Sequence, residues 1–89
     1  MAAARFEVFG RVQGVGFRFF AQRQAQTLRL RGWVRNRDDT AVEVYAEGSE
    51  HALDEFEREL RRGPATASVS RLVRRPAETS SLSDFQIRI

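Results

Sequence analysis

The period of the hydrophobic pattern changes in a definite order along the chain, and this order limits the possible folds more than any other feature. Apolar and polar residues alternate over residues 5–12, which predicts a strand, and from Phe17 the apolar residues recur at helical spacing. Alternation returns in residues 32–36 and 41–47. The polar turn 37–40 joins these two stretches, which predicts a β-hairpin.

A second helix and two further strands follow the hairpin. Ser49 is a typical helix N-cap, and Gly63 with Pro64 ends the helix, because glycine adopts the left-handed cap and proline cannot continue a helix. Residues 68–75 predict a strand, and residues 84–89 predict a short last strand. The βαββαβ order packs most simply as one antiparallel sheet with both helices on one face, plus the short C-terminal strand. We therefore expect an α+β protein with the ferredoxin-like sandwich fold.

Composition indicates a small globular protein and restricts the chemistry of its site. The 89 residues, 42% hydrophobic and 30% charged, suffice for one modest core, so we expect residues 1–89 to form a single domain. Cysteine and lysine are absent, which excludes disulfides, thiolate chemistry and Schiff bases. The sequence offers no convincing cluster of metal ligands. No segment resembles a signal peptide or a membrane span, and we expect a cytoplasmic protein with no membrane partner.

Charge is distributed unevenly between the two parts of the chain. Residues 1–37 carry eight arginines and one acid, whereas residues 38–89 carry seven arginines and eleven acids, so their net charges are +7 and −4. A basic N-terminal half indicates an anionic partner, small or polymeric. A nucleic-acid-binding module is therefore an alternative. The predicted central strands lack the aromatic signature of RNA-recognition domains, and we expect no specific nucleic-acid partner.

The stretch GRVQGVGFR, residues 10–18, follows the first predicted strand and leads into the first helix. Gly14 and Gly16 permit backbone conformations that turn successive N–H groups inward to form a concave anion site, and the helix start adds further free N–H groups. Arg18 stands where the helix dipole favours an acidic residue, and its guanidinium can grip two phosphate oxygens. The stretch predicts a phosphate-binding loop, although glycine-rich turns also occur for purely geometric reasons.

This stretch, together with GWVRN at residues 32–36, resembles the two signature segments of the acylphosphatases. The segments VEVYAEG and FQIR, and the glycine–proline pair after the second helix, extend the resemblance over most of the chain. The resemblance implies the ferredoxin-like fold and an enzyme that hydrolyses the carboxyl–phosphate anhydride of acyl phosphates without metal or cofactor. We expect an acyl phosphate as the small-molecule substrate, inorganic phosphate as product and inhibitor, and a monomeric protein.

The resemblance also assigns roles to individual residues. Arg18 matches the family's phosphate-binding arginine, and Asn36, the only asparagine of the chain, matches the asparagine that holds the attacking water. The family's loop of phosphate-binding N–H groups corresponds to Gln13, Gly14, Val15, Gly16 and Phe17. A non-catalytic accessory domain, like the acylphosphatase-like domain of larger carbamoyl-transfer maturation proteins, is a further alternative.

Two positions depart from the family pattern. Arg29 and Thr40 stand where relatives usually have glycines, at the end of the first helix and in the hairpin. A left-handed backbone retained at Arg29 would cost about 1–2 kcal/mol. On the face of the sheet that the helices do not cover, we expect cross-strand ion pairs, with Arg11 opposite Glu43 or Glu47.

Overall fold

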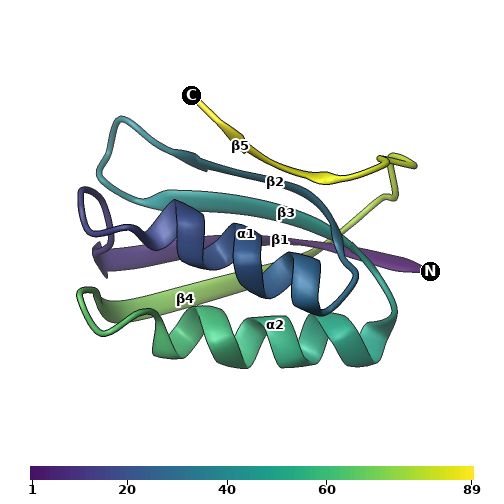
Figure 1. Cartoon of the computed structure of the whole chain (residues 1–89), viewed down its shortest axis with the longest axis horizontal. Helices are drawn as coiled ribbons and strands as arrows, with labels where there is room; N and C mark the ends of the chain where they lie inside the picture. Colours follow the sequence, from purple (N-terminus) through teal and green to yellow (C-terminus); the bar gives the residue numbers. More distant parts are fainter.

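The computed structural model describes residues 1–89 and shows two helices covering one face of a five-stranded sheet (Figure 1). The elements are β1 (Ala2–Arg11), α1 (Phe17–Thr27), β2 (Arg31–Asn36), β3 (Val42–Gly48), α2 (Glu50–Arg62), β4 (Ser68–Ala77) and β5 (Phe85–Arg88). The sheet order is β4–β1–β3–β2–β5. Strands β1 to β4 pair antiparallel, which confirms the predicted ferredoxin-like fold, whereas β5 pairs parallel to β2. Neither helix has the length and apolar character needed to cross a bilayer.

The main core lies between the sheet and the helices. One face of β1 and β3 is fully buried against the helices and consists of Phe6, Val8, Val42, Val44 and Ala46. Helix α2 contributes Leu53, Phe56 and Leu60 from one face. The ring of Phe56 meets that of Phe6 edge to face, with 5.6 Å between their centroids. Each such side chain contributes about 1.5–3 kcal/mol through burial. Ser49 caps α2 as predicted, because its Oγ accepts a hydrogen bond from the N–H of Ala52 at 3.0 Å.

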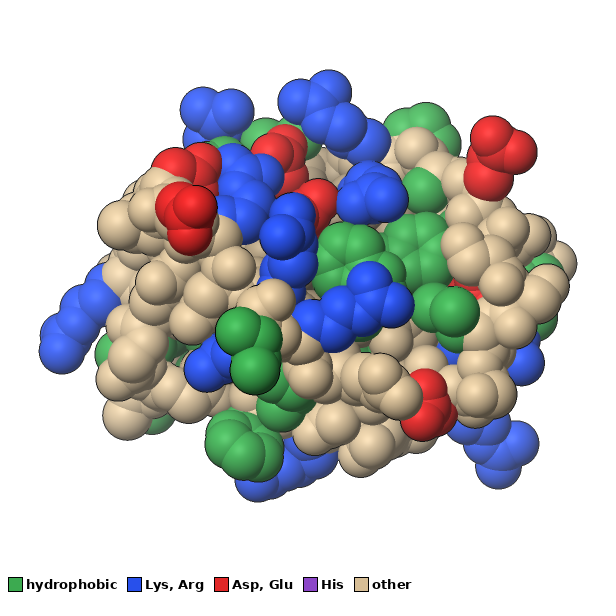
Figure 2. Space-filling view, turned by 90° about the horizontal axis from the view of Figure 1, so that it is seen from above, with side chains coloured by type: hydrophobic (Ala, Val, Ile, Leu, Met, Phe, Trp, Pro, Cys, Tyr) green, Lys and Arg blue, Asp and Glu red, His purple; other side chains and the backbone are tan.

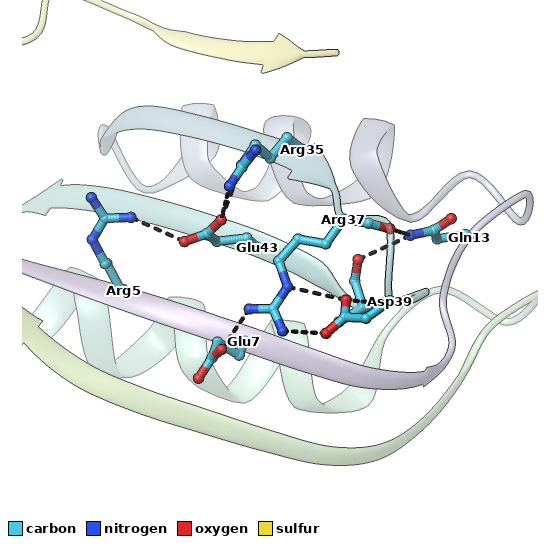
Figure 3. Close-up of polar contacts among 8 residues, drawn as sticks. Arg5, Glu7, Gln13, Arg35, Arg37, Asp39 and Glu43 are labelled. Atoms are coloured by element: carbon cyan, nitrogen blue, oxygen red, sulfur yellow. Dashed lines mark hydrogen bonds and ion pairs between the residues drawn. The ribbon is translucent and has the colours of Figure 1, made fainter.

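The second face of the sheet, opposite the helices, carries ion pairs (Figure 3). The guanidinium of Arg5 lies over the rings of Trp33 and Tyr45 on this face. Glu43 binds Arg35, its direct cross-strand neighbour, at 2.7 Å and Arg5 at 3.0 Å. The predicted pairing of Arg11 with Glu43 or Glu47 is therefore wrong, because Arg11 lies beside Ser68 at the far end of β1. Figure 2 shows the blue arginine side chains around the green apolar ones.

Glu47 is fully buried on this second face and anchors the connection from β4 to β5. Its Oε1 accepts hydrogen bonds from the N–H of Ser80 at 2.7 Å and from Oη of Tyr45 at 2.6 Å, while Oε2 accepts one from the N–H of Leu82 at 2.7 Å. Burial acts to raise the pKa of Glu47. The three hydrogen bonds and the nearby Arg31 outweigh burial, so this pKa lies below its ordinary value.

Glu47→Gln should destabilise the protein by about 1–3 kcal/mol at neutral pH, since an amide turns its NH₂ group toward one of the buried donors and leaves that donor unpaired. Because the folded-state pKa lies below the ordinary value of 4.5, the carboxylate's stabilisation is present in full above pH 4.5 and is lost as the pH falls through the lower value. Thermal melts of the wild type and of Glu47→Gln should show a difference in Tm that becomes smaller at acid pH. A difference that is independent of pH would contradict this assignment.

Two residues other than glycine occupy left-handed backbone conformations near the ends of β2. Arg29 has φ 59° at the end of α1, and Thr40 has φ 74° in the turn between β2 and β3. These are the two positions where the sequence departs from the family's glycines. The backbone geometry that favours glycine is therefore retained, and each residue carries a strain of about 1–2 kcal/mol.

Candidate active site

The loop between β1 and α1 has a backbone suited to binding an anion. Gly14 has φ 73° and Gly16 has φ 79°, conformations that glycine adopts without steric cost. A Cβ atom built at either glycine would meet no other atom within 4 Å. Packing therefore does not require these glycines, and the left-handed backbone does. Left-handed residues in a tight loop let neighbouring N–H groups converge on one side, as in many phosphate sites.

Arg18 lies in the first turn of α1, directly beside this loop. Gly16 caps the helix without a side-chain hydrogen bond, and the first turn contains no acidic residue. The first N–H groups of a helix have no partners within the helix, so this end is electropositive. The single polar contact of the Arg18 guanidinium is a long one, from Nη1 to the carbonyl oxygen of Arg88 at 3.5 Å. Guanidinium and helix dipole together favour an anion.

Asn36 ends β2 and faces the same space. Its Oδ1 is buried and has no hydrogen-bond partner within the protein, which is uncommon for a buried acceptor and is expected where water or a ligand binds. A hollow of about 210 Å³ is lined by Val12, Gly14, Gly16, Phe17, Arg18, Phe19 and Asn36. The structure thus brings Arg18 and Asn36 together with three of the five predicted loop residues.

The side chain of Gln13 points to the β2–β3 hairpin rather than into the hollow (Figure 3). Its Nε2 donates hydrogen bonds to the carbonyl oxygens of Arg37 at 2.8 Å and Ala41 at 3.0 Å. Asn36 immediately precedes Arg37, so this side chain ties the anion-binding loop to the strand end that carries Asn36. Sequence reasoning assigned Gln13 only as a member of the loop, and no local pattern indicates the contact with the hairpin.

A second long-range contact fixes the middle of the loop. Oγ1 of Thr66, in the α2–β4 connection, donates a hydrogen bond to the carbonyl oxygen of Val15 at 2.6 Å. In a trans peptide the C=O and the following N–H point in opposite directions. Thr66 therefore holds the Val15 carbonyl on one side, and the N–H of Gly16 points to the other. No pattern in the sequence singles out Thr66.

Arg37 follows Asn36 but is engaged on the second face of the sheet (Figure 3). Its Nη1 lies 2.5 Å from Oε2 of Glu7, and its Nη2 lies 2.6 Å from Oδ2 of Asp39. Hydrogen bonding to Arg37 holds the pKa of both carboxyl groups below their ordinary values. Arg18 lines the hollow, whereas the charge of Arg37 is balanced by its ion pairs with Glu7 and Asp39.

A larger and shallower hollow, of about 630 Å³, is lined by Arg5, Pro76, Ala77, Glu78 and Ser80. It shares no residue with the hollow at Arg18, and its arginine is already bound to Glu43. It has neither a loop of convergent N–H groups nor an unpaired buried acceptor. The smaller hollow is therefore the stronger candidate site. No group of three or more His, Cys, Asp or Glu side chains is placed to hold a metal ion.

Comparison with known proteins identifies the family of the chain. The family model described as Acylphosphatase matches residues 4–87. An acylphosphatase of Moorella thermoacetica is 47% identical over 88 residues, which cover 99% of this chain and 95% of that protein. The crystal structure of acylphosphatase from Bacillus subtilis superposes with a TM-score of 0.97 at 40% identity and full coverage of both chains. Full-length HypF in its phosphate- and nucleotide-bound form gives a TM-score of 0.88 at 31% identity, covering 98% of this chain and 12% of that one. From the family match, the relatives and the fold together, the chain belongs to the acylphosphatases, hydrolases that act on acyl phosphates.

Proposed function

We propose that the hollow at Arg18 binds the phosphate group of an acyl phosphate and that the chain hydrolyses the carboxyl–phosphate anhydride there. Arg18 holds two phosphate oxygens through its guanidinium, and the N–H groups of residues 13–17 surround the others. Asn36 orients the attacking water. The observation that carries this proposal is the unpaired, buried Oδ1 of Asn36 in the hollow that Arg18 also lines.

The reaction requires positioning and charge stabilisation more than proton transfer. The oxygen of the water attacks phosphorus, the bond from phosphorus to the acyl oxygen breaks, and the carboxylate leaves with the bonding electrons. One proton of the water stays on the attacking oxygen and the other passes to another phosphate oxygen, so inorganic phosphate is the second product. No His, Asp or Glu lines the hollow, which fits a step in which the substrate accepts the proton. Arg18 and the N–H groups stabilise the charge that develops around phosphorus.

Hydrolysis of acetyl phosphate by the purified chain should continue unchanged in excess EDTA. The proposal places the positive charge on Arg18 and on backbone N–H groups, and these need no metal ion. Initial rates measured with and without chelator check this expectation, and wild-type protein without added metal is the control. A rate that falls in EDTA and recovers on addition of Mg²⁺ would overturn the metal-independent mechanism.

A second candidate is an accessory phosphate-binding domain without activity of its own. It is favoured by the likeness to HypF, because this fold makes up only 12% of that longer protein. The isolated chain would then bind phosphate but release none from acetyl phosphate. The acetyl phosphate assay separates the two candidates.

We further propose that residues 1–89 act as one monomeric domain in the cytoplasm with no specific nucleic-acid partner. Any binding to RNA or DNA should be weak, independent of sequence and lost at moderate salt, because it would rest on surface arginines alone. Sedimentation at several protein concentrations tests the monomer, and titration with labelled oligonucleotides at two salt concentrations tests the nucleic-acid expectation.

A further inference from the structure

The exposed apolar side chains are concentrated near Arg18. Three large hydrophobic residues are strongly exposed: Met1, Phe19 and Ile89, with relative exposures of 76%, 69% and 112%. Phe19 follows Arg18 in α1 and lines the same hollow. Ile89 follows Arg88, whose carbonyl oxygen is the polar contact of the Arg18 guanidinium. Phe19 therefore adjoins the arginine of the proposed site, and Ile89 is the next residue after the backbone carbonyl that this arginine contacts.

The packing of α1 does not explain why a phenylalanine occupies position 19. Phe17 is buried in the core, and the half-buried Phe20 packs against it with 5.8 Å between the ring centroids. Phe19 leaves about two thirds of its surface in water and contributes correspondingly little to the core. Isolated exposed apolar residues are common on protein surfaces. Phe19 differs from these because it forms part of the wall of a hollow with polar groups at its base.

The hollow is also larger than a phosphate group requires. At about 30 Å³ for each water molecule, a volume of 210 Å³ corresponds to about seven waters. Phosphate has only five heavy atoms, so part of the volume remains open when phosphate lies against Arg18. Arg18 and Phe19 are consecutive residues that line one hollow. A phosphate on the guanidinium therefore places the attached acyl group within reach of the phenyl ring.

We propose that Phe19 is a specificity-determining residue that contacts the acyl half of the substrate. The chemical class that fits is an acyl phosphate with an aromatic or bulky apolar acyl group, since such a group removes the exposed ring from water and can stack on it. This inference rests on the proposed function, because it assumes that acyl phosphates are hydrolysed in this hollow. Phe19 takes no part in the reaction at phosphorus.

The test compares benzoyl phosphate, which presents a ring, with acetyl phosphate, which presents one methyl group. Steady-state kinetics would be measured for the wild type, Phe19→Gln and Phe19→Leu. Phe19→Gln should lower kcat/KM for benzoyl phosphate roughly two- to tenfold, mainly through KM, and should change the value for acetyl phosphate less than twofold. Phe19→Leu keeps an apolar side chain and should retain most of the preference. Inhibition by inorganic phosphate should be equal in all three proteins, because phosphate does not reach the ring.

The possible outcomes separate this inference from the proposed function. A ratio of benzoyl to acetyl phosphate activity that is unchanged in Phe19→Gln would overturn the role of Phe19 and leave the proposed function standing. Equal losses on both substrates, with weaker inhibition by phosphate, would also overturn it, because Phe19 would then support the loop rather than the acyl group. Wild-type protein that hydrolyses neither substrate would refute the proposed function itself.

Discussion

Arg18→Ala should abolish phosphate binding and lower kcat/KM for acetyl phosphate by about a thousandfold or more. Losing a positioned donor or an arginine that stabilises a developing phosphate charge typically costs roughly 10²–10⁵ in rate. The fold should be unaffected, since the guanidinium makes only one long polar contact, to the carbonyl oxygen of Arg88. Inorganic phosphate should raise the Tm of the wild type, because it binds only the native state, and should leave the Tm of the variant unchanged.

Two further variants define what Arg18 contributes. Arg18→Lys keeps a positive charge but cannot present two parallel donors, so it should restore little of the phosphate affinity. Arg23→Ala is the matched control, because Arg23 is an exposed arginine of the same helix and its loss changes the net charge equally. It should bind phosphate almost as the wild type does. Calorimetric titration of phosphate into each protein measures these affinities, and wild-type affinity in Arg18→Ala would show that the binding loop is misassigned.

Asn36→Ala should leave phosphate affinity near the wild-type value while turnover falls by about two to three orders of magnitude. The substitution removes the unpaired Oδ1 but introduces no charge into the hollow. A group that orients water acts mainly in the transition state, and its loss lowers kcat more than it weakens ground-state binding. Turnover on acetyl phosphate and calorimetry with inorganic phosphate check the two halves of this expectation.

Asn36→Asp should fail at binding as well as at turnover. The side chain keeps its shape but places a carboxylate beside a phosphate that carries up to two negative charges. At roughly 5 Å and an effective dielectric constant near 20, each pair of like charges costs about 3 kcal/mol before screening. Equal phosphate affinity in the Asp and Ala variants, or near-normal turnover in Asn36→Ala, would mean that Asn36 only terminates the strand. Circular dichroism of both variants verifies that they fold.

Local signals predicted the order of the elements well, because periodicity and caps are properties of short segments. Ser49 caps α2, and Gly63 follows it with a positive φ of 68°. The parallel pairing of β5 with β2 was not predictable, since a strand pattern does not specify a partner. The surroundings of Glu47 were equally beyond what a local pattern can predict. Alternation correctly placed it on the face opposite the core, but only the tertiary structure shows that the β4–β5 connection covers it.

The same distinction applies to the candidate site. Gly14, Gly16 and Arg18 lie in one short stretch, and their residue types alone predicted an anion-binding loop. Asn36 came from the family resemblance, because a lone asparagine at a strand end is ordinarily a turn residue. The contacts of Gln13 with the hairpin and of Thr66 with the loop join residues 24 to 51 positions apart, so no local pattern could indicate them.

The interior place of β1 in the sheet, between β4 and β3, has a consequence for how the chain folds as it is synthesised. β1 pairs with β3 on one side and with β4 on the other, so both partners leave the ribosome after it. The edge of β1 that pairs with β3 stays open until Gly48 has emerged, and the edge that pairs with β4 stays open until Ala77 has emerged. Pairing between such distant segments is slow compared with folding of a helical protein of this size. An unpaired strand edge invites association with other chains. Arg5, Glu7 and Arg11 lie on the polar side of β1 and act against that association while the chain is incomplete.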